Sequence, residues 1–169
     1  YGLIAFLMVS LGLVALFLYV SNQLVNDLAR QERDRMQLWA DATQRLADLN
    51  QGDPEADAAN IDFLFSIIER NRTIPVLLTD DAGNIILHRN FDLPEPIDTL
   101  SPWVTSPANE AFLQRKLERL QKGDNQIRIP LSDGTAQMLY FADSKLLYRL
   151  SYYPYVQLFV MLVFVMIVY

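Results

Sequence analysis

The chain has 169 residues, a formal net charge of -6, no cysteine and a single histidine. The acidic balance argues against binding to nucleic acid and against docking on anionic lipid. The lack of cysteine excludes disulfides, cysteine-based zinc sites and thiol nucleophiles, and one histidine excludes a multi-histidine metal site within a single chain.

Both ends of the chain are apolar. Residues 1–20 and 152–169 contain no Asp, Glu, Lys or Arg, and a helix as long as the second stretch rises about 27 Å, close to the roughly 30 Å core of a bilayer. We therefore expect two transmembrane helices, residues 1–22 and 152–169, around one polar domain, residues 23–151. A cleaved signal peptide is the alternative for the first stretch, but its apolar run exceeds a usual signal core and no small-residue cleavage site follows.

The orientation in the membrane is less directly encoded. The chain begins with Tyr1 and ends inside an apolar run, so we expect it to be a piece of a longer protein. Arg30, Arg33 and Arg35 follow the first apolar stretch and by themselves favour a cytoplasmic domain. Long segments translocate largely regardless of charge. We therefore expect residues 23–151 outside the cytoplasm, with both ends of the chain on the other side.

The first apolar stretch continues into a polar one without Gly or Pro until Gly52 and Pro54, which predicts a continuous helix to about Asn50. Apolar residues three or four apart predict one buried stripe along its outer half, which Glu32 interrupts. The stripe either packs on its own domain or pairs with a second chain. Its members are Val25, Leu28, Met36, Trp39, Ala42, Leu46 and Leu49.

A turn at residues 50–54 and a second helix, residues 55–71, come next. Residues 74–79 and 85–88 are apolar runs on either side of turn residues 80–84, which predicts a β-hairpin. Because the runs are apolar at consecutive positions, we expect both faces of the hairpin to be covered. We interpret Asp80 and Asp81 as turn formers and not as paired carboxylates for acid-base work or Ca²⁺.

A long loop with four prolines, residues 90–110, follows the hairpin. Long ordered loops are often binding loops or lids, and Trp103 is the expected anchor of this one. A third helix is expected over residues 108–121, ended by Gly123.

Three strands are predicted after this helix, at residues 126–131, 135–141 and 145–151. Pro130 cannot donate a hydrogen bond to a neighbouring strand, so the first of them should lie at a sheet edge. Pro154 should separate the last strand from the second membrane helix. An aromatic belt at the membrane surface is expected from Tyr148, Tyr152, Tyr153 and Tyr155.

Residues 76–86, with the sequence VLLTDDAGNII, look like the first hairpin of a PAS domain. Together with the order of the other elements, over residues 24–153, the chain resembles the extracytoplasmic PAS-like (Cache-type) sensor regions of bacterial sensor histidine kinases with two transmembrane helices. The resemblance implies an α+β fold with an antiparallel five-stranded sheet in the order 2-1-5-4-3 and a long N-terminal helix. It also implies the bacterial inner membrane, with residues 23–151 on the periplasmic side.

The resemblance implies a kinase parent, but the kinase itself is not expected here. His88 lies on a predicted strand outside the membrane and is not a phosphoacceptor, and the sequence has no Gly-rich nucleotide motif. We expect no catalytic residue, metal or cofactor in this segment. The ATP-dependent protein histidine kinase activity would belong to a region beyond Tyr169.

A sensing pocket is predicted between the sheet and the loop of residues 91–109. Its candidate ligand-binding residues are Trp103, Arg128, Tyr140 and Tyr148. Core packing is the alternative for the two tyrosines, and an exposed position at a sheet edge is the alternative for Arg128 and for His88.

The predicted function is a signal-input module that converts an extracytoplasmic stimulus, which the sequence does not identify, into relative motion of two transmembrane helices. The lipid bilayer is one expected partner. A second copy is the other, since the long mixed-charge helix favours a parallel homodimer. The alternative is a membrane receptor module that senses a protein or the envelope and binds no small ligand.

Overall fold

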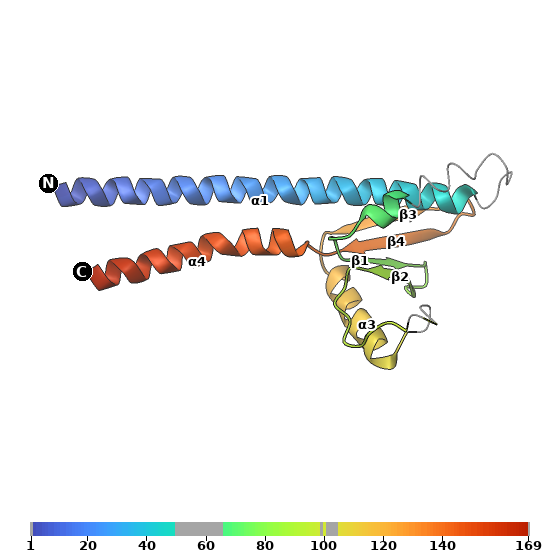
Figure 1. Ribbon diagram of the computed structural model, residues 1–169. Coiled ribbons are helices and arrows are strands. Elements are labelled where there is room, and N and C mark those ends of the chain that lie inside the picture. The colour runs from blue at the N-terminus through green and yellow to red at the C-terminus, as the bar shows by residue number, and fades with distance from the viewer. Residues whose placement is uncertain (1, 50–65, 99, 101–104, 169) are drawn as a thin grey trace. The chain divides into compact units, whose positions relative to one another are not determined.

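A computed structural model of the chain describes residues 2–49, 66–98, 100 and 105–168. Contacts divide the chain into two units (Figure 1). The helical unit comprises Tyr1–Glu32 and Asp143–Tyr169, and the sheet unit comprises Arg33–Ala142. One helix, α1 (Gly2–Leu49), contributes residues to both units.

The sheet unit contains four antiparallel strands in the order β2-β1-β4-β3. They are β1 (Val76–Thr79), β2 (Ile85–Arg89), β3 (Gln126–Pro130) and β4 (Ala136–Phe141). The predicted hairpin is confirmed as the β1–β2 pair. The predicted edge position of the Pro130 strand is also confirmed, because β3 pairs with β4 alone.

The predicted fifth strand, residues 145–151, is wrong. These residues form the beginning of α4 (Lys145–Val168), and helix α4 continues through Pro154, which was expected to be a break. Leu146 and Tyr148 would share one face of such a strand, but they are 60% and 68% exposed, whereas Leu147 between them is buried. The predicted order 2-1-5-4-3 placed the fifth strand beside β1. In the structure β4 pairs with β1 instead.

Both faces of β1 are covered, as the apolar runs predicted, but β2 is only partly buried and its Ile86 is 52% exposed. On one face, Val76 and Leu78 belong to a buried cluster with Met36 and Trp39 of α1. On the other face, Leu77 belongs to a second cluster with residues of α3 (Pro107–Gln121). For the stripe of α1, packing on its own domain is thus confirmed at Met36, Trp39 and Ala42, all of which are buried.

The β1–β2 turn shows why its acidic residues are there. The Asp80 carboxylate accepts hydrogen bonds from the Asn84 backbone N–H at 2.8 Å and from Asn84 Nδ2 at 2.9 Å, and these bonds lower the pKa of Asp80. Gly83 has a φ of 85°, in the left-handed region that glycine tolerates best. Asp81 Oδ2 accepts from the Ala136 N–H at 3.1 Å. Asp80 is therefore a turn former, as predicted, whereas the carboxylate of Asp81 connects the turn to β4.

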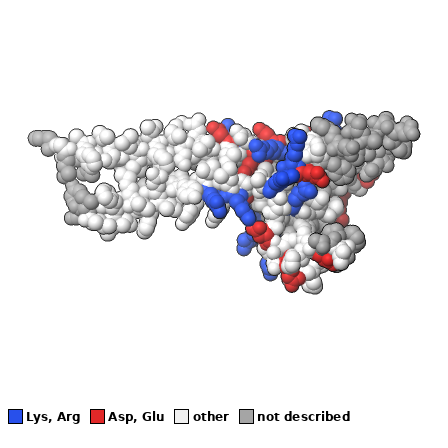
Figure 2. Space-filling model, viewed as in Figure 1, with Lys and Arg blue, Asp and Glu red and all other residues white. Residues whose placement is uncertain are grey.

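Helices α1 and α4 are long and apolar enough to cross a membrane, by length and composition. Figure 2 shows that the visible face of their apolar segments carries no charged side chain. In water such a surface would aggregate. The large apolar side chains of these segments, such as Phe6, Leu11, Phe159 and Phe164, are instead exposed at levels that suit contact with lipid.

One testable consequence of the fold concerns pH. His88 lies on β2, opposite Leu77 of β1, and partial burial lowers its pKa below the ordinary 6.5. As the pH falls below about 6.5, the unfolded chain takes up a proton at His88 before the folded chain does, so stability should fall. We expect His88→Gln to reduce the pH dependence of the melting temperature of the chain in detergent between about pH 7 and pH 5. Equal pH slopes for both proteins would contradict this assignment.

Candidate functional site

Among the described residues, Glu32 is the one charged side chain that is buried, with 6% of its surface exposed. It lies on α1, at the end of the helical unit. Its Oε2 accepts a hydrogen bond from the Ser144 backbone N–H at 3.2 Å, and its Oε1 accepts from the Ser144 hydroxyl. A buried carboxylate is tolerated only when such donors replace its water. We call this contact the Glu32–Ser144 joint.

Ser144 also begins helix α4. Its Oγ accepts from the Leu147 N–H at 3.2 Å, the bond of a helix N-cap, and its carbonyl accepts from the Tyr148 N–H at 3.0 Å. The carboxylate of Glu32 thus lies at the N-terminus of α4, where the helix dipole favours negative charge. Residues 142–144 are all that separates α4 from β4. The joint therefore connects α1 to the point where the chain leaves the sheet.

Between the joint and the two ends of the chain, α1 and α4 lie side by side and leave two grooves. One, of about 450 Å³, is lined by side chains that include Ser21 and Asn22 of α1 and Tyr148, Tyr152 and Tyr155 of α4. Three of the tyrosines predicted for an aromatic belt thus line one groove, spread over about two turns of α4.

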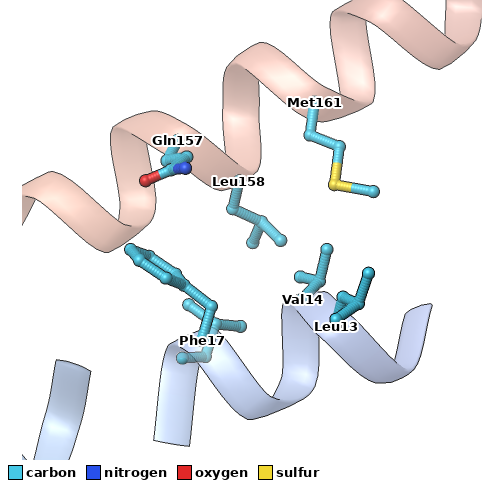
Figure 3. A pocket seen from close by; sticks show the side chains of 7 residues that line it. Leu13, Val14, Phe17, Gln157, Leu158 and Met161 are labelled. Atoms are coloured by element: carbon cyan, nitrogen blue, oxygen red, sulfur yellow. The ribbon is translucent and has the colours of Figure 1, made fainter. Parts of the chain in front are cut away.

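The second groove, of about 210 Å³, lies between the apolar segments (Figure 3). Leu13, Val14 and Phe17 of α1 point toward Leu158 and Met161 of α4. Gln157 is the polar side chain among the residues that line it.

The residues that were predicted to form a ligand pocket belong to two different units. Arg128 and Tyr140 belong to the sheet unit, whereas Tyr148 belongs to the helical unit, on a helix and not on a strand. Tyr140 is buried with Leu77 and Leu117, so the core-packing alternative is confirmed for it, and Arg128 is exposed on the edge strand. Trp103 lies outside the described residues.

The described part of the loop is held by a residue that sequence reasoning missed. Asn109 is buried at the start of α3, where its Oδ1 accepts from the Glu95 N–H at 2.9 Å and its Nδ2 donates to the Glu95 carbonyl at 3.0 Å. This pair of bonds imitates a strand ladder and fixes the loop to the helix. Ser106 caps the same helix by accepting from the Asn109 N–H. The pair Ser106-Pro107 before an amphipathic run was the sequence signal for the start of this helix.

The described residues contain no group of three or more His, Cys, Asp or Glu that could hold a metal ion. The candidate site is therefore the joint, where one buried carboxylate, one hydroxyl and one helix N-terminus meet. Comparison of the chain with protein-family models, with curated proteins and with solved structures gives no match.

Proposed function

We propose that the chain is the membrane-anchored signal-input module of a bacterial sensor histidine kinase, with a PAS-like sheet unit on the periplasmic side. The kinase core that it controls would follow Tyr169 inside the cell. Two apolar helices and an antiparallel sheet support the membrane-anchored module. The kinase core is placed elsewhere because the sequence has no Gly-rich nucleotide motif.

The observation that carries the proposal is the continuity of α1. A single helix from Gly2 to Leu49 includes an apolar segment and also supplies Met36 and Trp39 to the core of the sheet unit. A helix is stiff along its axis because each turn is hydrogen-bonded to the next. A shift of the Trp39 turn would therefore move the apolar segment of the same helix.

The Glu32–Ser144 joint supports the second half of the mechanism. It holds the N-terminus of α4 on α1, so the relative position of the two helices is fixed at one place by specific bonds. Helix shifts of about 1–2 Å are common in switching proteins. A stimulus would act by stabilising one arrangement over the other, which requires different affinity for the two.

The proposed orientation is testable because the chain has no cysteine. Ala82 lies exposed in the β1–β2 turn, so Ala82→Cys provides one accessible thiol. We expect a membrane-impermeant maleimide to label this variant in spheroplasts with intact inner membranes. Labelling that requires permeabilised inner membranes would reverse the proposed topology.

The proposal includes a parallel homodimer. The outer half of α1 supports it, since this long helix is unbroken and carries a face of mixed charge that suits pairing with a second helix. Single cysteines along residues 21–35 should crosslink in membranes with helical periodicity. Uniform absence of crosslinks along this segment would count against the dimer.

The function is tested by joining the cytoplasmic core of a well-characterised histidine kinase after Tyr169 and measuring phosphorylation of its response regulator. Asp27 is exposed on α1, between the apolar segment and Glu32. Asp27→Pro removes a helix hydrogen bond and breaks the rigid connection at a cost of about 3 kcal/mol, whereas Asp27→Ala keeps it.

We expect Asp27→Pro to shift the output severalfold and Asp27→Ala to leave it unchanged. Equal output from both variants and the parent, at equal protein levels in the membrane, would overturn the proposed coupling.

A module that senses a protein or the envelope remains the second candidate. It is favoured by the filled faces of the sheet, where Leu77 and Leu139 have no exposed surface. A hybrid that responds to partner proteins and to no small molecule would support it. If a small ligand binds, its site should lie away from these two filled faces.

A further inference from the structure

The sheet unit carries a groove whose charge differs from that of the acidic chain. It lies between α1 and residues 67–74 and has a volume of about 410 Å³, within the range of about 300–1,000 Å³ that is usual for small-molecule sites. The described residues that line it include two arginines, Arg35 and Arg70, and no Asp or Glu. We call it the Arg35–Arg70 groove.

The rest of the lining is mainly apolar. Met36 and Trp39 come from α1, and Ile67 and Ile74 come from the opposite side. Met36, Trp39 and Ile74 are held in the core of the sheet unit, with at most 2% of their surface exposed. These three lie beneath the groove, so the apolar base that a ligand can touch is formed by Leu38, which is 55% exposed, and by the half-buried Ile67. Such a base favours a ligand with an apolar body.

The two arginines have no other role in the described structure. Both are exposed, and neither makes an ion pair or a hydrogen bond with another described residue that would hold it in place. By contrast, Arg33 and Arg89 donate to backbone carbonyls. Two guanidinium groups without a partner among the described residues, at one groove, match a carboxylate, which guanidinium binds with short, charge-assisted hydrogen bonds.

We propose that the Arg35–Arg70 groove binds an amphiphilic monoanion, of the class of medium-chain fatty acids. The alkyl chain lies against Leu38 and Ile67, next to the buried Trp39, and the carboxylate pairs with Arg35 and Arg70. A small polyanion such as citrate would leave the apolar base unused. Binding at this groove does not depend on whether the chain controls a kinase.

The experiment uses the intact chain in nanodiscs of zwitterionic lipid. Trp103→Phe leaves Trp39 as the sole tryptophan, since the chain has two, so the emission of Trp39 reports on the groove. Octanoate is titrated below its micelle concentration, with 1-octanol as the neutral probe and citrate as the polyanion. Octanoate also partitions into the lipid, but this background is the same for every variant.

We expect octanoate to shift the Trp39 emission saturably. Arg35→Gln and Arg70→Gln should each weaken its binding about 5- to 10-fold, and the double variant about 30-fold or more. Arg45→Gln is the control, because Arg45 is exposed on the same helix outside the groove, and it should change binding less than about 2-fold. None of these substitutions should alter any response to 1-octanol.

Two results would overturn the proposal. A response to octanoate that does not saturate, or that is unchanged in the double arginine variant, would show that the arginines bind no carboxylate. Citrate that binds more tightly than octanoate would exclude the amphiphilic class. Circular dichroism of each variant confirms that the exposed arginines were replaced without loss of fold.

Discussion

Replacing Trp39 with Ala should lower the free energy of unfolding of the sheet unit by about 3–5 kcal/mol. Trp39 is 2% exposed and belongs to the buried cluster that joins α1 to the sheet. Ala would remove the whole indole from a closely packed site, and the helix and sheet cannot collapse fully into the space. Chemical denaturation of the intact chain in detergent, followed by circular dichroism, measures the loss.

Two matched variants separate packing from other effects. Leu38 is the neighbouring residue but is 55% exposed, so Leu38→Ala should change stability by only about 0.5 kcal/mol. The indole N–H of Trp39 is buried without a hydrogen-bond partner among the described residues, so Trp39→Phe loses no hydrogen bond there and should cost clearly less than Trp39→Ala. Equal losses for Trp39→Ala and Leu38→Ala would contradict the placement of Trp39 in the core.

Much of the sheet unit could be predicted because its signals are local. The turn at residues 80–84 is specified by Asp, Gly and Asn side chains that act within the turn itself. The edge position of β3 follows from Pro130, whatever the neighbouring strand is. Helix α3 follows from an apolar stripe and its end at Gly123. None of these features needs knowledge of a distant contact.

The start of α4 could not be predicted in the same way. Leu146, Tyr148 and Leu150 occupy alternate positions, which satisfies the period of a strand. Leu147 and Leu150 are three residues apart, which also satisfies the period of a helix. The deciding feature was Ser144, whose hydroxyl caps the helix. A Ser before an apolar run is also a usual turn residue. Local chemistry therefore permitted both structures.

The candidate site was half visible in the sequence. Glu32 interrupts the apolar stripe of α1, and a carboxylate in a buried position needs hydrogen-bond donors. Its partner, Ser144, lies 112 residues away, between the strands that the sequence predicts at residues 135–141 and 145–151. No periodic pattern links the two positions. Only the fold that returns the chain to α1 after β4 identifies the donor.

Replacing Glu32 with Ala should release the N-terminus of α4. The substitution removes the acceptor of the Ser144 N–H and hydroxyl, and a buried donor without a partner costs about 1–3 kcal/mol. Asp34→Ala is the control, since Asp34 is exposed two residues further along α1. Hydrogen exchange reports the effect directly, because the Leu147 and Tyr148 amides both donate to Ser144.

We expect Glu32→Ala to accelerate exchange of these amides about 5- to 150-fold, as 1–3 kcal/mol implies, and Asp34→Ala to leave it unchanged. Glu32→Gln keeps one oxygen that can accept, so its effect should be intermediate. Ser144→Ala removes the partner and the helix cap together, and should therefore exceed the roughly 1 kcal/mol of a cap alone. In the double variant the two losses should not add, because both remove the same contact. Full additivity would show that Glu32 and Ser144 act independently, and the joint could then not transmit motion between α1 and α4.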